Sequence, residues 1–158
     1  MRGGPRAAGA CLSEAADRGA SRRWPATRRL LSPAQFAAVT SDPQALRSAR
    51  RWLALAARRR TELGAAPVRF GFAASRRLAP LAVQRNTVKR ILREAARHHL
   101  ATLDAAVAGG AADVVLRLKA RVPARGELTL AAWKAALRAE ADALLDRLAA
   151  ELRAQGGA

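Results

Sequence analysis

The chain has 158 residues and a formal net charge of +17, which is enough length for one domain with a modest core. Cys11 is the only cysteine, which excludes an internal disulfide and a cysteine-based zinc site. No stretch approaches the ~20 apolar residues of a membrane span. We therefore expect a protein of the reducing cytoplasm with no membrane partner.

The positive charge is unevenly distributed along the chain. Residues 1–126 carry 25 basic and 7 acidic residues, whereas residues 127–158 carry 4 basic and 5 acidic residues. All the cations except three lysines are arginines, which pair bidentately with phosphate and stack on bases. A GC-rich genome would also raise arginine and alanine. The asymmetry indicates a polyanionic partner.

The N-terminal third of the chain is expected to contain a basic arm, a short helix and a strand. Residues 1–28 are rich in Arg, Ala and Gly and lack the apolar core of a secretory signal. We expect a disordered basic arm there, unless translation starts further downstream. Ser32 and Pro33 are typical of a helix N-cap and first helical position, and they predict a short helix over 33–39. Residues 50–57 fit a helix or a strand, and we favour a strand because a second strand follows.

Clearer patterns mark the remaining elements. Residues 68–74 alternate in the manner of a half-buried strand. A helix is expected from about 83 to 103, a β-branched strand over 113–118, and a long helix over 128–153 that packs one side on the sheet. This order predicts one α/β or α+β sandwich.

The helix at residues 85–97 combines a basic face with an apolar face. At about 100° per residue, Val88, Ile91, Leu92 and Ala95 fall together on one side. Solvated helix faces usually mix charge signs, so a one-sided row of cations indicates nucleic-acid binding over simple solvation. The polar side holds Arg85, Asn86, Lys89, Arg90, Arg93 and Arg97.

Residues suited to catalysis are scarce. His98 and His99 point about 100° apart on a helix, so they cannot share one metal ion, and we expect structural or surface roles for them. Glu94 is the only acid of the basic segment and is expected to pair with Arg90 or Arg97. The sequence shows no paired carboxylates, no nucleophile with a base and no phosphate-binding glycine loop. It predicts no catalytic and no metal-binding residues, so any catalytic groups would come from a partner.

Two linked motifs resemble a known family. Residues 70–77 read FGFAASRR and residues 82–94 read AVQRNTVKRILRE. The combination resembles the bacterial ribonuclease P protein family, in which a strand ends in Ser-Lys-Lys or similar and a helix with Arg-Asn-Arg-x-x-Lys-Arg-x-x-Arg-Glu follows. The resemblance extends from Arg29 into the last helix. It has three departures, because Thr87 replaces the second arginine, and Thr40 and Leu55 stand where aromatic residues are common.

The resemblance implies a fold and a function. The fold is a mixed sheet of about four strands with three helices, in the order αβββαβα with a left-handed βαβ crossover, in one domain over 29–155. The function is that of the protein subunit of ribonuclease P, an endoribonuclease. The RNA subunit holds most of the Mg²⁺, supplies the catalytic groups and removes the 5′ leader of precursor tRNA, while the protein assists and broadens substrate specificity. A 1:1 complex of protein and RNA subunit is expected.

The resemblance also implies two binding surfaces. The polar side of the basic helix would contact the RNA subunit, and a cleft between the first helix and the sheet would hold the leader. Phe70 and Phe72 share a strand face, where we favour core packing over base stacking, and Trp133 is expected in the core as well. A generic basic RNA-binding protein associated with the ribosome is the alternative, and a stand-alone nuclease lacks the necessary side chains. The leader candidates are Phe36, Leu53, Arg76 and Arg77.

Overall fold

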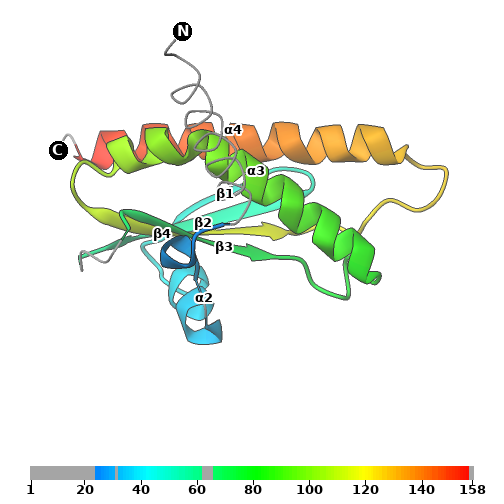
Figure 1. Cartoon of the computed structure of the whole chain (residues 1–158), viewed down its shortest axis with the longest axis horizontal. Coiled ribbons are helices and arrows are strands. Elements are labelled where there is room, and N and C mark those ends of the chain that lie inside the picture. The colour runs from blue at the N-terminus through cyan, green and yellow to red at the C-terminus, as the bar shows by residue number, and fades with distance from the viewer. Residues whose placement is uncertain (1–23, 31, 62–65, 157–158) are drawn as a thin grey trace, which may run out of the picture.

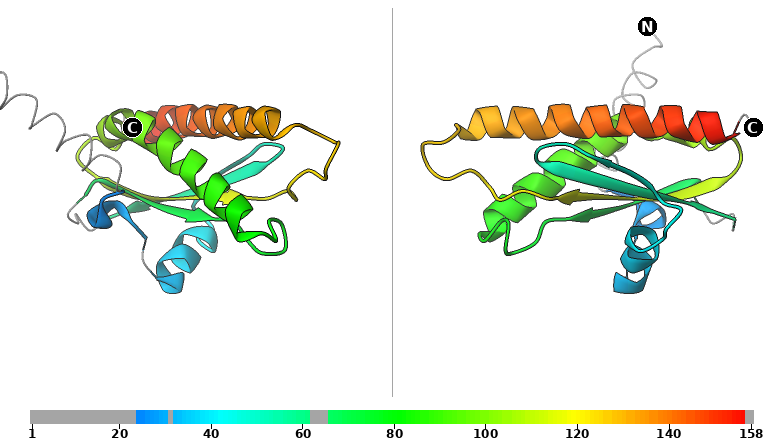
Figure 2. Two further views of the ribbon diagram at one scale, coloured as in Figure 1. Left: turned by 45° about the vertical axis from the view of Figure 1, so that its right-hand side comes forward. Right: turned by 180° about the vertical axis from the view of Figure 1, so that it is seen from behind.

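A four-stranded sheet with helices on both faces forms the protein (Figure 1). The computed structural model describes residues 24–30, 32–61 and 66–156. Helices α3 and α4 cover one face, and α2 lies alone on the other (Figure 2). The elements are η1 (Ala26–Arg28), α2 (Pro33–Thr40), β1 (Leu46–Ala49), β2 (Leu53–Arg60), β3 (Val68–Ala73), α3 (Ala82–Ala106), β4 (Ala111–Leu118) and α4 (Leu130–Gly156).

The sheet has the strand order β1-β2-β4-β3. β1 and β4 pair antiparallel with β2, whereas β3 and β4 are parallel neighbours that α3 connects. The predicted α+β architecture and the order αβββαβα are confirmed. Among the described helices, none combines the length and apolarity needed to cross a bilayer.

The strand expected over 50–57 is confirmed as β2, but it begins later than expected. β1 ends at Ala49, residues 50–52 form a turn, and β2 begins only at Leu53. The turn is fixed by a backbone bond from Arg50 N to Leu53 O at 2.8 Å and by Glu140 of α4. The Glu140 carboxylate accepts from the backbone N–H groups of Trp52 and Leu53 at 2.8 and 3.1 Å. This tertiary contact, which no local pattern signals, sets the start of β2.

Two hydrophobic cores lie on the two faces of the sheet. The main core lies under α3 and α4 and contains Phe70 and Trp133, which are 1% and 2% exposed, as expected. Phe72 lies on the same strand face but is only partly buried. The second core is small and packs α2 onto the sheet through Leu30, Val39, Ala56 and Val115.

The domain begins earlier than residue 29. Trp24 is 4% exposed and its ring packs edge-on against Phe70 and Phe72, with centroids 5.5 and 5.7 Å apart. Arg28 binds both carboxylate oxygens of Asp104 in α3, at 2.9 and 2.8 Å. Residues 24–28 are therefore part of the fold and not of a disordered arm, and the rest of the predicted arm lies outside the described residues.

Candidate nucleic-acid interface

Helix α3 presents its two predicted faces as the spacing requires. Val88, Leu92 and Ala95 are fully buried against the main core, and Ile91 packs beside them. The opposite side is half-buried or exposed throughout and is called the basic face of α3 below. It consists of Arg85, Asn86, Lys89, Arg90, Arg93 and Arg97.

Positive charge is concentrated at the middle of this face. Partial burial, and then the neighbouring guanidinium groups of Arg97, Arg29 and Arg90, lower the pKa of Arg93. A guanidinium stays protonated at neutral pH, so like charges are held close together here. Their mutual repulsion would be relieved by a bound anion, which suits a polyphosphate ligand.

Arg85 and Thr87 also serve the start of α3. The Arg85 guanidinium donates to the carbonyl oxygens of Ala79 and Pro80 at 3.0 and 2.8 Å, which fixes the connection from β3. The Thr87 hydroxyl donates to Val83 O at 2.8 Å and is turned back onto its own helix. Residue 87 therefore adds no charge to the basic face.

A groove begins where the basic face of α3 meets α2 and β3. A cavity of about 300 Å³ has Lys89 and Arg93 on one wall and Phe36 of α2 on the other. Gly71 forms part of its floor, and a Cβ atom there would lie 2.6 Å from Phe36 Cζ, so glycine is required for this close approach. The remaining lining residues are Trp24, Arg29, Leu30, Phe70 and Phe72.

A second cavity, of about 350 Å³, lies along the same side of α2. Thr40, which lies one helical turn after Phe36, lines it. Arg47 of β1 and Arg117 of β4 provide its cations. Two rows of cross-strand neighbours form the floor, Gly71, Val115, Ala56 and Arg47 in one and Ala73, Arg117, Ala54 and Ala49 in the other. The two cavities along α2 are together called the α2 groove below, and each has its own pair of cations, Lys89 with Arg93 and Arg47 with Arg117.

A third cavity, on the opposite side of α2, has a different character. It contains Arg60 and Arg69, but both pair with the buried Asp113 at 2.8 Å. Because Asp113 engages both guanidinium groups and offsets one of their two charges, this cavity is a poorer phosphate site than the α2 groove.

The four predicted leader residues lie in three different environments. Phe36 lines the α2 groove, as expected. Leu53 is 0% exposed and packs in the main core on the other face of the sheet, so its prediction as a leader contact is wrong. Side chains of a strand alternate between its two faces, so the next residue, Ala54, faces the groove instead. Arg76 and Arg77 are exposed in the turn after β3, and their contact with RNA stays a prediction.

Three groove cations were missed at the level of sequence. Arg117 stands between two buried leucines in β4, and this alternation could have indicated an exposed strand position. No such pattern marks Arg47, because β1 has only four residues and is too short to show a clear alternation. Arg29 lies outside any strand and joins β3 by one isolated bridge, which leaves no pattern in the sequence.

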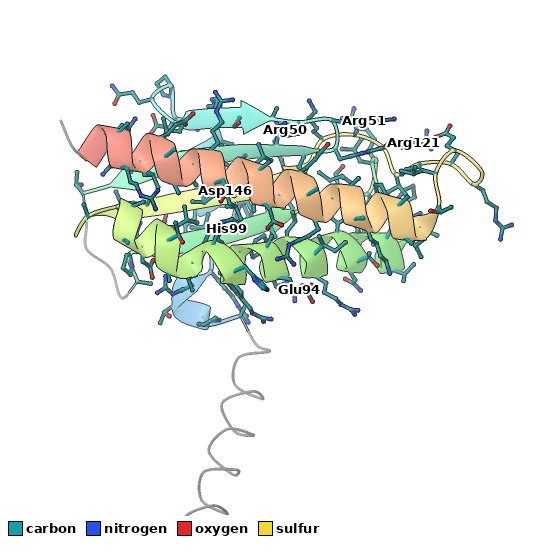
Figure 3. The ribbon with its side chains drawn as sticks, turned by 90° about the horizontal axis from the view of Figure 1, so that it is seen from above. Arg50, Arg51, Glu94, His99, Arg121 and Asp146 are labelled. Carbon is teal, nitrogen blue, oxygen red and sulfur yellow. The ribbon has the colours of Figure 1, made fainter. Side chains whose placement is uncertain are left out.

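Glu94 and His99 of α3 form ion-pair contacts with α4. Glu94 pairs with Arg138 of α4 at 3.9 Å, which corrects the expectation of a partner on its own helix. His99 lies between the helices, 3.1 Å from Asp142 and 3.3 Å from Asp146, so its role is structural (Figure 3). The described residues bring together no group of three His, Cys, Asp or Glu side chains suited to a metal ion.

A cationic helix face and a cationic groove on one α+β domain define an RNA-binding protein. The family model described as Ribonuclease P matches residues 24–148. The ribonuclease P protein component of Bordetella avium is 38% identical over 125 residues, covering 79% of this chain and 94% of the relative. That of Bordetella parapertussis is 35% identical over 126 residues, with the same coverage.

A solved structure agrees with the fold. The Staphylococcus aureus RNase P protein matches with a TM-score of 0.58 at 21% identity, over 77% of this chain and 94% of that one. The chain belongs to the ribonuclease P protein family. Its role is that of a protein subunit of the ribonuclease P endoribonuclease in tRNA 5′ processing, with the ribonuclease P RNA and precursor tRNA as partners.

Proposed function

We propose that this chain binds the catalytic RNA through the basic face of α3 and holds the 5′ leader of precursor tRNA in the α2 groove. One observation carries the proposal, namely that Lys89 and Arg93 belong to both surfaces. A leader in the groove would then lie against the same helix that contacts the ribozyme. The protein thus aligns substrate and catalyst, while the RNA subunit performs the hydrolysis.

The chemistry of the α2 groove suits a single strand without strict sequence preference. Phe36 offers an apolar ring to bases, and the cations of the two cavities suit phosphates. Thr40 replaces an aromatic residue of the family pattern, and its hydroxyl donates to Phe36 O at 3.0 Å. Leu55, which stands where the family often has an aromatic residue, is 4% exposed and packs in the main core. We infer that this replacement affects core packing more than base stacking. We infer that leader stacking rests mainly on Phe36.

Magnesium, stoichiometry and compartment belong to the same proposal. Several carboxylates are occupied by protein cations, such as Asp104 by Arg28 and Asp113 by Arg69. This supports catalytic Mg²⁺ held mainly by the RNA subunit. One basic face per chain supports a 1:1 complex with that RNA, and precursor tRNA as substrate supports the cytoplasm.

The test separates the two surfaces by their RNA partners. Phe36→Ala is expected to reduce the preference of the holoenzyme for precursor tRNA with a long leader over one with a single-nucleotide leader. Each stacked base contributes roughly 1–3 kcal/mol, so a reduction of about tenfold is expected. Affinity for the RNA subunit should stay unchanged.

The second variant is expected to affect binding of the RNA subunit and not of the leader. Arg90→Ala is expected to weaken binding of the RNA subunit and to lower the salt slope of that affinity by about one. Filter binding over a range of salt measures both quantities. Equal effects of the two variants on both RNA ligands would contradict the assignment of separate surfaces.

A further inference from the structure

Helices α3 and α4 lie side by side and run in the same direction (Figure 3). Glu94 pairs with Arg138, and His99 contacts Asp142 one turn further along. Toward the N-terminal ends of both helices, the seam opens into a hollow of about 340 Å³. It shares no lining residue with the α2 groove and is lined by Thr87, Arg90, Ile91, Glu94, Lys134, Ala135 and Arg138.

The three cations of this hollow differ in whether an acidic side chain pairs with them. Arg138 is held by Asp142, whose two oxygens lie 3.2 Å from its Nε, and by Glu94 at 3.9 Å. Arg90 and Lys134 are both exposed and form no hydrogen bond or ion pair with any other residue of the described ranges. Two cations from different helices therefore face one hollow without an acid of their own.

Lys134 is one of two cations of α4 without an acidic partner among the described residues, and the other, Arg153, lies near the far end of the helix. Residues 127–158 hold only four basic residues and have a net negative charge. Arg147 pairs with Glu151 at 2.9 Å on the same helix, as Arg138 does with Asp142. Lys134 lines the same hollow as Arg90, so it extends the positive surface of α3 onto the N-terminal part of α4.

We propose that Arg90 and Lys134 together bind one backbone phosphate of the RNA subunit in this hollow. Lys134 supplies there the charge that residue 87 lacks, because Thr87 and Lys134 line the same hollow and the Thr87 hydroxyl is turned to Val83 O. Two cations converging from separate helices hold a phosphate more firmly than one flexible side chain. This inference rests on the proposed function and extends the RNA-binding surface to α4.

The primary test compares two exposed cations of α4. Lys134→Gln removes the proposed contact, and Arg153→Gln is the matched control, roughly 28 Å further along the same helix. Arg153 is likewise exposed and without a hydrogen bond or ion pair among the described residues. Loss of one phosphate contact is expected to weaken RNA-subunit binding about fivefold near 0.15 M salt and to lower the salt slope by about one. Arg153→Gln should change neither quantity, and thermal melting verifies that both variants fold.

A second variant tests whether residues 87 and 134 serve the same phosphate. Thr87→Arg is expected to restore affinity and salt slope in the Lys134→Gln protein, and to add much less in the unmodified chain. Equal gains in both backgrounds would overturn the shared site. A separate measurement gives the affinity of the preassembled holoenzyme for precursor tRNA. If Lys134→Gln weakens only this affinity, the assignment of the contact to the RNA subunit is wrong.

The outcomes also separate this inference from the proposed function. If the unmodified chain fails to bind the catalytic RNA, the proposed function is wrong. If it binds and Lys134→Gln binds equally well with the same salt slope, only the α4 contact is wrong.

Discussion

At the scale of single residues, Gly71 determines the shape of the α2 groove. Gly71→Ala would place a methyl group 2.6 Å from Phe36 Cζ and 3.2 Å from Leu30 Cδ1, so the Phe36 ring must shift. Overpacking of this kind costs typically about 1–3 kcal/mol, and we expect about 1–2 kcal/mol because the ring is half-buried and can rotate. Denaturant unfolding measures the loss, and affinity for precursor tRNA with a long leader should fall with it.

The matched control for Gly71→Ala is a compensating change. Combining it with Phe36→Leu removes the ring atoms that the new methyl group would meet, so stability should largely return while leader binding stays weak. Wild-type stability and leader affinity in Gly71→Ala alone would show that Phe36 does not pack over residue 71 in solution.

Residue orientation could be predicted on α3 and not on β2, for a physical reason. Along α3 the helical period assigned buried and exposed positions correctly, since Val88 and Leu92 are fully buried. In a strand, side chains alternate with period two, so the assignment depends on where pairing begins. Leu53 was misplaced because its surroundings are set by Glu140, 87 residues away in the chain.

At the scale of elements, the basic face of α3 depends on the anchor beneath it. Leu92 is fully buried between α3 and the sheet, and Leu92→Ala leaves a cavity in the main core. Large-to-small core changes of this type cost roughly 2–5 kcal/mol. We expect a loss of about 3 kcal/mol in the free energy of unfolding, measured by denaturant titration.

RNA binding by Leu92→Ala supplies the control for that prediction. Under conditions in which the variant is folded, its affinity for the RNA subunit should match that of the unmodified chain, because no cation has been removed. Unchanged stability would mean that α3 is not held by this side chain. A loss of affinity in the folded state would mean that Leu92 affects the basic face directly.

The long periodic elements could be predicted from sequence, and so could the short helix α2, because Ser32 and Pro33 mark its start. The short strand β1 could not. Helices α3 and α4 and strands β3 and β4 were found close to their observed bounds, because each is long and has a regular apolar pattern. β1 has four residues and a weak alternation, and it is stable only as the edge partner of β2. The segment at residues 24–28 owes its order to Trp24 and Arg28, which bind side chains of β3 and α3.

At the scale of the whole molecule, the sheet separates a structural side from a groove side. α3 and α4 bury the main core on one face, while α2 covers only part of the other and leaves a floor of small residues open beside it. α3 contributes to both sides, since its buried residues pack in the main core and its Lys89 and Arg93 line the groove. The net charge of +17 therefore has two distinct uses in this account, ribozyme binding and leader binding.

The family match agrees with this division. The motif at residues 70–94 allowed the family to be inferred before the fold was known. The proposed contribution of α4 could not be inferred in that way. Lys134 and Arg90 line the same hollow only because two helices that are distant in sequence pack together.

The most direct test of the central claim is reconstitution with the catalytic RNA. Purified protein is added to that RNA and precursor tRNA at a magnesium concentration too low for efficient cleavage by the RNA alone. We expect strong stimulation of 5′ cleavage that saturates at one protein per RNA, with no cleavage by the protein alone. Absence of stimulation, in a protein that still binds RNA, would contradict a role in ribonuclease P and leave a generic RNA-binding protein.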